Sequence, residues 1–277
     1  MLKIGFIDYY LDEWHANSYP KMIRDAVGEE MTVAYAYGQI PSPITGMTSE
    51  QWCEKYGVAL CETIEELVEK SDVLLVLSPD NCEMHEQLCQ IPLRSGKRTY
   101  IDKTFAPDLP TARRIFALAE QYGTPCYSTS ALRYADEYVN WHSEPITAIS
   151  SWGPNGFDRY SIHQLEPVMM LMRCPVKRVL YTAAEKWYTV NLEFTDGRFA
   201  TVTGFEGGCP FMMQVATTGE AKAVSVTSDF FGAFIRQLCD FYRTGIPKVP
   251  HEETLDIMAV RGAVLKAMET PGQWVEL

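Results

Sequence analysis

The segment Gly96-Lys97-Arg98-Thr99-Tyr100-Ile101-Asp102-Lys103 places an acidic and a basic side chain next to each other at the end of a predicted strand. In an open parallel sheet, ligands bind at the edge formed by the carboxyl ends of the strands. A lysine there can hydrogen-bond a hydroxyl or carbonyl oxygen, and a neighbouring carboxylate can set its charge state. A solvated Asp102–Lys103 pair in a loop is the alternative, and these two residues alone do not exclude it.

A second candidate is His163, which falls on a predicted helix over residues 161–172 together with Glu166. Histidine has a pKa suited to moving a proton near neutral pH. A lone histidine on a helix with apolar neighbours is often structural, and that interpretation also stays open. His163 and Glu166 at i,i+3 have the spacing of two metal ligands, but no third ligand stands nearby in the sequence. We therefore expect no metal site.

The first half of the chain alternates strands and helices. The run at residues 72–77 is almost entirely apolar, as expected of a parallel strand covered on both faces. Repeated β-α units of this length predict a doubly wound parallel sheet of the Rossmann type. The expected strands are 2–7, 32–37, 72–77, 99–102 and 125–128, and the expected helices are 13–27, 49–56, 63–70, 80–94 and 108–122.

The second half follows a different pattern, with longer strands that alternate apolar and polar residues. Asp196-Gly197 predicts a hairpin turn, because this pair readily adopts positive φ. The pattern predicts an α+β domain with an open, mostly antiparallel sheet. We place the two domains at 1–128 and 129–277. The expected strands are 146–152, 176–183, 188–194, 199–205, 212–217 and 223–227, and the helices are 161–172, 230–244 and 252–269.

Composition narrows the class of protein. The 277 residues carry a formal net charge of −12, which argues against nucleic acid or an anionic membrane surface as a partner. No apolar run has the length of a membrane span, and the N-terminus lacks the features of a signal peptide. The eight cysteines include no C-x-x-C pair, which favours reduced thiols over a zinc site. We expect a cytoplasmic protein.

Several short motifs, in order and spacing, resemble the Gfo/Idh/MocA family, which includes glucose–fructose oxidoreductase and inositol dehydrogenase. The resemblance runs over nearly the whole chain. Its parts are Ser78-Pro79 with His85 on the next helix, the segment 96–103, Ser130-Ala131-Leu132-Arg133-Tyr134, Tyr160-Ser161-Ile162-His163-Gln164-Leu165-Glu166, and Gly245-Ile246-Pro247 followed by a helix from Glu252.

This resemblance implies a dinucleotide-binding domain followed by a substrate and oligomerisation domain. It implies NAD or NADP as cofactor, a small polyhydroxylated substrate, and a homodimer or homotetramer formed through the C-terminal sheet. It further implies that Lys103 hydrogen-bonds the reacting oxygen and that His163 donates or accepts the proton. The cofactor-binding residues it suggests are Asp8, Tyr10, Trp14, His15, Ser78, Pro79, His85, Asp102 and Lys103. The substrate-binding residues it suggests are Arg133, Tyr160 and Glu166.

The chain departs from the family at the first βα turn. A dinucleotide fold normally has a glycine-rich turn here, whose amides bind the pyrophosphate. This chain has only Gly5, inside the strand, and Asp8, Asp12 and Glu13 place negative charge in the region. Asp12 is a candidate N-cap of the following helix.

Three other positions also differ. The end of the second strand, Ala36-Tyr37-Gly38-Gln39, has neither the acid that would bind the NAD ribose nor an arginine for NADP. Thr104 replaces the family proline after the lysine, where family members often have a cis peptide. Arg159 stands where an aspartate is common, with Asp158 one place earlier.

Two functions from different classes therefore remain. The first is an NAD(P)-dependent oxidoreductase that transfers a hydride to or from a hydroxyl or carbonyl carbon of a sugar, cyclitol or related polyol. The second is a non-catalytic ligand-binding or regulatory protein that retains the fold but binds a dinucleotide weakly or not at all. Lys103 and His163 favour the first, and the first turn favours the second.

Overall fold

A computed structural model describes residues 1–141 and 145–277 of the chain. The chain divides into two compact units. Unit 1 comprises residues 1–129 and 234–251, and unit 2 comprises residues 130–233 and 252–277. The predicted second domain was continuous from 129 to 277. In the structure, residues 234–251 group with the first unit instead.

Unit 1 contains a six-stranded sheet in the order β3-β2-β1-β4-β5-β6, with every neighbouring pair parallel. The order reverses beside β1, so β1 and β4 meet at the topological switch point where ligands bind in such sheets. The predicted doubly wound sheet is confirmed. The strands are β1 (Leu2–Asp8), β2 (Met31–Gly38), β3 (Ala59–Leu60), β4 (Val73–Val76), β5 (Thr99–Ile101) and β6 (Cys126–Tyr127).

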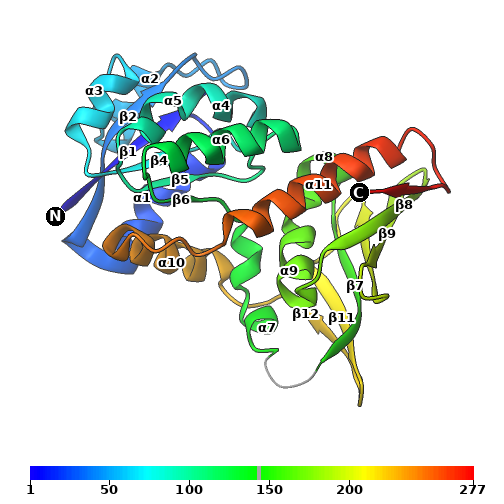
Figure 1. The fold of residues 1–277 in the computed structure, drawn as a ribbon. Coiled ribbons are helices and arrows are strands. Elements are labelled where there is room, and N and C mark those ends of the chain that lie inside the picture. Colours follow the sequence, from blue (N-terminus) through cyan, green and yellow to red (C-terminus); the bar gives the residue numbers. More distant parts are fainter. Residues whose placement is uncertain (142–144) are drawn as a thin grey trace. The chain divides into compact units, whose positions relative to one another are not determined.

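Helices lie on both faces of this sheet, with α1 and α10 on one side and α3 to α6 on the other (Figure 1). The predicted helix 80–94 is broken into three short pieces, η2, α4 and α5. The break between α4 and α5 is explained by Pro92, which has no N–H to donate to the carbonyl of Leu88. The helices are α1 (Trp14–Val27), α2 (Ser49–Tyr56), α3 (Ile64–Lys70), α4 (His85–Leu88), α5 (Gln90–Arg94), α6 (Leu109–Gln121) and α10 (Phe230–Thr244), with 3₁₀ turns η1 (Gly28–Glu30) and η2 (Cys82–Met84).

The later part of α10 is tied to unit 1 by hydrogen bonds as well as by packing. The Tyr242 hydroxyl donates to the Leu74 carbonyl over 2.9 Å, and Arg98 Nη1 donates to the Tyr242 carbonyl over 2.5 Å. Arg243 pairs with Glu30 through two hydrogen bonds of 2.6 and 2.7 Å. Since Leu74 lies in the centre of the sheet, this helix completes the core of the unit.

Unit 2 contains a seven-stranded sheet in the order β12-β11-β7-β10-β9-β8-β13. All neighbouring pairs are antiparallel except β7 and β10, so the predicted open, mostly antiparallel sheet is confirmed. The strands are β7 (Ile146–Pro154), β8 (Val176–Ala184), β9 (Trp187–Phe194), β10 (Phe199–Phe205), β11 (Met212–Thr217), β12 (Ala221–Ser225) and β13 (Trp274–Glu276). The helical elements are η3 (Ala131–Tyr134), α7 (Asp136–Val139), α8 (Phe157–Tyr160), α9 (Ile162–Met172) and α11 (His251–Ala267).

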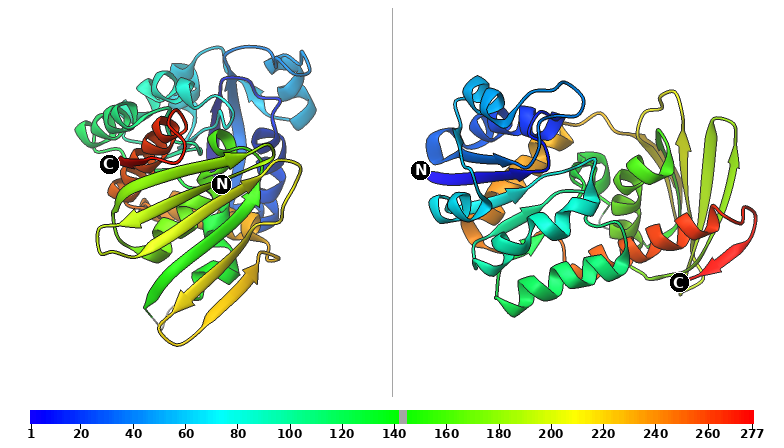
Figure 2. Two further views of the ribbon diagram at one scale, coloured as in Figure 1. Left: turned by 90° about the vertical axis from the view of Figure 1, so that its right-hand side faces the viewer. Right: turned by 90° about the horizontal axis from the view of Figure 1, so that it is seen from above.

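The two faces of the second sheet differ in chemistry. One face is apolar and buried, with Val190 and Val202 in its centre. Helix α9 packs on this side, where Gln164 accepts a hydrogen bond from Ser151 and donates one to the Thr203 carbonyl. The left view of Figure 2 shows the other face without a helix in front of it. That face carries small and hydroxyl side chains with exposed aromatic residues: Trp152, Trp187, Phe199, Phe205 and Trp274.

Candidate functional site

The candidate cofactor site of unit 1 is organised by the carboxyl ends of three adjacent parallel strands. Ile7, Val76 and Ile101 are in register across β1, β4 and β5. The residue that follows Ile7 in β1 and the residue that follows Ile101 of β5 are both aspartates: Asp8 is the last residue of β1, and Asp102 comes directly after β5. Both carboxylates are almost completely buried, each with 1% exposure. The strand register thus brings together two acids that are far apart in the sequence.

A histidine and a third acid complete this acidic cluster, which we define as Asp8, Glu13, His15 and Asp102. His15 Nδ1 lies 3.2 Å from Glu13 Oε2 and 3.5 Å from Asp102 Oδ2. Burial raises the pKa of Asp8 well above its usual range, and the charges of Glu13 and Asp102 raise it further. Asp8 therefore binds a proton more readily than an aspartate in water does. Within the part of the chain that the structure describes, no group of three or more acidic, histidine or cysteine residues is arranged to hold a metal ion.

Glu13 is the N-cap of α1, in place of the predicted Asp12. Its Oε2 accepts a 2.7 Å hydrogen bond from the His15 amide, and its Oε1 accepts one from the Ala16 amide. Asp12 instead accepts hydrogen bonds from the side chains of Asn17 and Thr45. Glutamate is uncommon as an N-cap, which is why the sequence pointed to the shorter acid.

The first βα turn as it stands does not fit the pyrophosphate of a dinucleotide. The amides at the N-terminus of α1 that would bind a phosphate already bind the Glu13 carboxylate. Asp8, predicted to contact the cofactor, is buried beside this carboxylate. Tyr10 is also buried, and its amide donates to Asp8 over 3.3 Å. Trp14 is half exposed, and its indole ring lies edge-on to the ring of His15.

The end of β4 holds the predicted Ser78, Pro79 and His85. Ser78 has a φ of 79°, and its hydroxyl donates to the Asn81 carbonyl over 3.0 Å, while Pro79 is partly exposed. His85 has no exposed surface. Its Nδ1 lies 3.0 Å from the Phe105 carbonyl oxygen, and its Nε2 lies 2.5 Å from that of Leu77. A side chain buried in this way does not reach a ligand, so the predicted cofactor contact of His85 does not fit the structure.

His85 instead positions the loop that carries Lys103. It connects the end of β4 to the Phe105 carbonyl, two residues beyond the lysine. Lys103 itself follows β5 at the ligand-binding edge and is partly exposed, as predicted from the strand pattern. The Lys103–Thr104 peptide bond is cis, although residue 104 is not a proline.

In unit 2, the candidate catalytic residue His163 lies on the first turn of α9. Its Nδ1 is 2.7 Å from the Ser130 hydroxyl oxygen. Its ring lies edge-on to those of Tyr160 and Phe211, with centroids 5.5 and 5.9 Å away. The imidazole is partly exposed and is oriented by the serine and two aromatic rings. Ser130 belongs to one of the motifs of the sequence, but without a structure nothing indicated that it pairs with His163.

The predicted substrate-binding residues Arg133 and Glu166 are brought together, but they are buried and pair with each other. Arg133 Nη1 lies 3.4 Å from Glu166 Oε2, and it also hydrogen-bonds Glu253 of α11. Arg133 is 7% exposed and Glu166 is 3% exposed. This arrangement indicates that the pair orients α9, and hence His163, within unit 2. Asp158 likewise pairs with Arg261. The predicted Tyr160 is exposed, next to His163.

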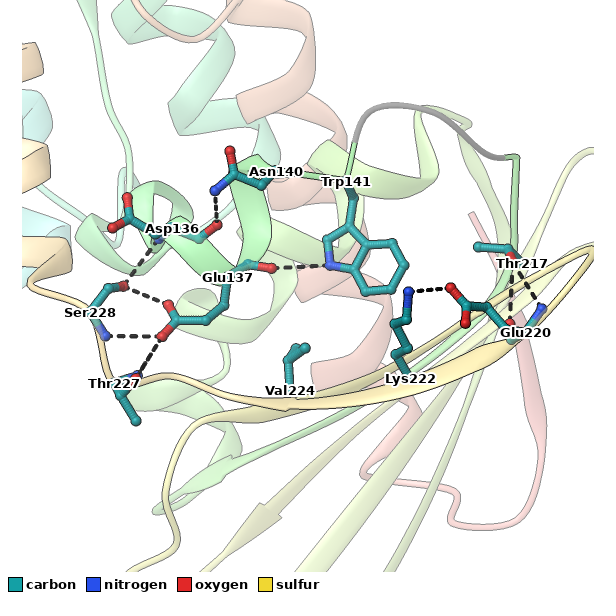
Figure 3. A pocket seen from close by; sticks show the side chains of 10 residues that line it. All are labelled: Asp136, Glu137, Asn140, Trp141, Thr217, Glu220, Lys222, Val224, Thr227 and Ser228. Carbon is teal, nitrogen blue, oxygen red and sulfur yellow. Dashed lines mark hydrogen bonds and ion pairs between the residues drawn. The ribbon is translucent and has the colours of Figure 1, made fainter.

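Unit 2 also contains an open cavity of about 800 Å³ (Figure 3). Most of its polar groups bond one another. Glu137 accepts hydrogen bonds from Ser228 and Thr227, and Lys222 pairs with Glu220. Partial burial acts to raise the pKa of Glu137, but these hydrogen bonds outweigh it and lower the pKa to about 2. The lining residues are Asp136, Glu137, Asn140, Trp141, Thr217, Glu220, Lys222, Val224, Thr227 and Ser228.

Comparison with known proteins identifies part of unit 1. Residues 44–130 match the family described as "Oxidoreductase family, NAD-binding Rossmann fold". An 86-residue segment is 30% identical to dTDP-3,4-didehydro-2,6-dideoxy-alpha-D-glucose 3-reductase of Actinomadura kijaniata. That segment is 29% of this chain and about a quarter (26%) of the reductase. The family match includes Lys103 and begins after the first βα turn.

Solved structures match the fold over both units. The scyllo-inositol dehydrogenase of Lactobacillus casei, with bound NAD(H) and scyllo-inositol, is 14% identical with a TM-score of 0.80, covering 99% of this chain and 98% of the dehydrogenase. The myo-inositol 2-dehydrogenase of Lactobacillus plantarum is 13% identical with a TM-score of 0.80, covering 100% and 99%. At this level of identity the likeness concerns the fold alone.

The fold and the comparisons together define the class of protein. Unit 1 has the Rossmann fold of the NAD-binding oxidoreductases, followed by the open-sheet unit that the inositol dehydrogenases also have. Residues 44–130 are therefore similar in sequence to this oxidoreductase family, and the chain as a whole is similar in fold to the inositol dehydrogenases. Within the described residues, none of the helices combines the length and the apolar character of a membrane span.

Proposed function

We propose that this protein is an NAD(P)-dependent oxidoreductase acting on a sugar, cyclitol or related polyol, in the class that interconverts a hydroxyl and a carbonyl group by hydride transfer. The observation that carries the proposal is the position of Lys103. It follows β5 at the ligand-binding edge of the sheet, within the segment that matches the oxidoreductase family. Relatives of the same fold bind scyllo-inositol, and a partial relative reduces a nucleotide-linked sugar, which supports a polyhydroxylated substrate.

The proposed roles follow from the chemistry of the two side chains. When a carbinol is oxidised, its hydroxyl proton must leave, so a proton acceptor is needed within hydrogen-bond reach. His163 serves as that group, and Ser130 holds its ring in place. Lys103 donates a hydrogen bond to the same oxygen and stabilises the negative charge that develops on it. Lys103 belongs to unit 1 and His163 to unit 2, and their joint action on one oxygen is part of the proposal.

Nucleotide binding is the first test. NADH or NADPH is titrated while tryptophan fluorescence is followed, since Trp14 and Trp52 both belong to unit 1. We expect quenching with at least one nucleotide. Turnover is then assayed with myo-inositol, scyllo-inositol and a panel of aldoses. Absence of binding at millimolar concentration of both nucleotides would refute the oxidoreductase function.

The second candidate function is a ligand-binding or regulatory protein without turnover. One observation favours it, namely that the Glu13 carboxylate occupies the amides at the N-terminus of α1. Under this function, a polyol would bind to unit 2 without any dependence on nucleotide. Calorimetric titration of inositols with and without NADH separates the two functions, because an oxidoreductase of this class should bind the nucleotide itself.

We also propose that the protein forms a homodimer or homotetramer through the second sheet. The exposed face carries Trp152, Trp187 and Phe199, which are 43%, 44% and 46% exposed. Exposed apolar surface of this kind usually marks an interface.

All eight cysteines are free, which supports the proposed location in the reducing cytoplasm.

A further inference from the structure

The N-terminus of α1 is occupied by the chain's own carboxylate. Glu13 accepts hydrogen bonds from the amides of His15 and Ala16, and its Oε2 also lies 3.2 Å from Nδ1 of His15. Glu13 is 7% exposed, so this carboxylate is held within the fold rather than extended into solvent. These contacts are the ones that a phosphate group makes at the first helix of a dinucleotide fold. Glu13 therefore takes the place of an anionic ligand.

The residues around Glu13 also disfavour a second anion at the N-terminus of α1. Asp8 ends β1 and Asp102 directly follows β5, the two neighbours of β4 in the sheet, and both are buried. Burial raises the pKa of Asp8, and the charges of Glu13 and Asp102 raise it further, as expected for carboxyl groups that lie close together. Asp8 Oδ2 has no hydrogen-bond partner among the described residues. A second anion brought into this turn while Glu13 remains in place would meet electrostatic repulsion, and the His15 and Ala16 amides that could offset it are already bound to Glu13.

We propose that Glu13 is a specificity-determining residue that competes with the pyrophosphate of the dinucleotide for the N-terminus of α1. The inference rests on the proposed function and specifies how its cofactor site is controlled. The dinucleotide binds only when the Glu13 side chain turns away from the helix, so part of the binding free energy is used to displace it. The chain consequently holds its cofactor more weakly than it would with a small neutral residue at position 13.

Glu13→Ser is the decisive variant. Serine is a preferred N-cap, so the variant removes the carboxylate but keeps a side-chain acceptor for the helix. Asp108→Ser is the matched control. Asp108 caps α6 of the same unit by accepting a 2.7 Å hydrogen bond from the Thr111 amide, so this control removes an acidic cap elsewhere. Thermal melting without ligand establishes that both variants are folded.

The experiment measures the dissociation constants of NADH and NADPH for the wild type and both variants, at one fixed salt concentration. We expect Glu13→Ser to bind at least one nucleotide about tenfold more tightly than the wild type, and Asp108→Ser to bind like the wild type. Equal affinity of wild type and Glu13→Ser would overturn the inference and leave the proposed function standing. If no form binds either nucleotide, both the inference and the oxidoreductase function are overturned.

Discussion

The Ser130 hydroxyl oxygen lies 2.7 Å from His163 Nδ1, and the same oxygen accepts a hydrogen bond from the Leu132 amide. A hydroxyl oxygen can accept a second hydrogen bond, so a hydrogen on Nδ1 can point toward Ser130, which places the lone pair of the neutral ring on Nε2, where it can accept a proton. In a proton-transfer mechanism, this serine acts by orienting the histidine rather than by contacting the reacting carbon.

Ser130→Ala should lower kcat by about 2–10-fold, the factor expected for the loss of one hydrogen bond, with little change in KM. The pH–rate profile should also shift, because the histidine loses a partner at Nδ1. Ser130→Thr keeps the hydroxyl and should restore much of the activity. A purely structural serine would change thermal stability but leave the pH profile unmoved.

Lys103→Met should lower kcat by roughly 10²–10⁴, because it removes a charged donor while it keeps the side-chain length. His163→Asn should behave similarly. If the two groups act on one oxygen, the double variant should lose less than the product of the two single losses. Steady-state kinetics of the three variants test this, and full activity in Lys103→Met would refute the proposed mechanism.

Arg133→Met should destabilise the protein by about 3–5 kcal/mol, because it removes the positive charge that pairs with the buried Glu166 and with Glu253. Adding Glu166→Gln to this variant should recover part of the loss. Urea unfolding measures both effects. If the variant has normal stability but a raised KM, the result would instead support the substrate-binding role that the sequence predicted for Arg133.

The stability of the protein should depend on the titration of His85. Burial lowers the pKa of His85 below its usual value of 6.5, and the carbonyl oxygens of Phe105 and Leu77, which favour the protonated ring, only partly oppose this shift. As the pH falls through about 6.5, the unfolded state binds the proton before the folded state does, so stability is lost. For one proton the slope is at most about 1.4 kcal/mol per pH unit.

His85→Gln keeps hydrogen-bonding groups but does not titrate, so it is the suitable comparison. The unfolding free energies of wild type and variant should differ most at pH 7, and the difference should shrink as the pH falls toward 5. Parallel curves over this range would show that the fold does not depend on a neutral His85.

The exposed face of the second sheet can be tested by placing a charge in its centre. Thr201 of β10 lies on this face, where its hydroxyl donates to Ser150 over 2.9 Å. We expect the wild type to be a dimer or tetramer at micromolar concentration and Thr201→Arg to be monomeric. Gln121→Arg, at the exposed end of α6, is the control. A monomeric wild type by light scattering would refute the proposed interface.

Much of the fold was predictable because its signals are local. The apolar run at 72–77 and the Asp196-Gly197 turn both gave elements close to those observed. The two-residue β3 was missed, because it is too short to show a period. The grouping of α10 with unit 1 was not predictable, because an amphipathic helix does not show which apolar surface it covers.

In the candidate site, too, the features that depend on neighbouring residues were predictable and those that depend on tertiary packing were not. Lys103 was placed at a strand end because a strand is recognised from neighbouring residues. The pairing of Ser130 with His163, and of Arg133 with Glu166, depends on tertiary packing between segments that lie 33 residues apart. The role of Glu13 as a cap was missed because side-chain rotamers, not residue types, decide which of two adjacent acids reaches the amides.

The grouping of residues 234–251 with unit 1 has a consequence for the order of synthesis. The aromatic rings of Tyr100 and Tyr127 lie 5.4 and 4.9 Å from those of Phe234 and Phe241, which leave the ribosome long after the six parallel strands. Until then, the nascent sheet has an uncovered aromatic surface, and the Leu74 carbonyl lacks the hydrogen bond from the Tyr242 hydroxyl. A polypeptide cut after residue 129 is therefore an unfinished domain, and it should require α10, supplied in trans, to become soluble.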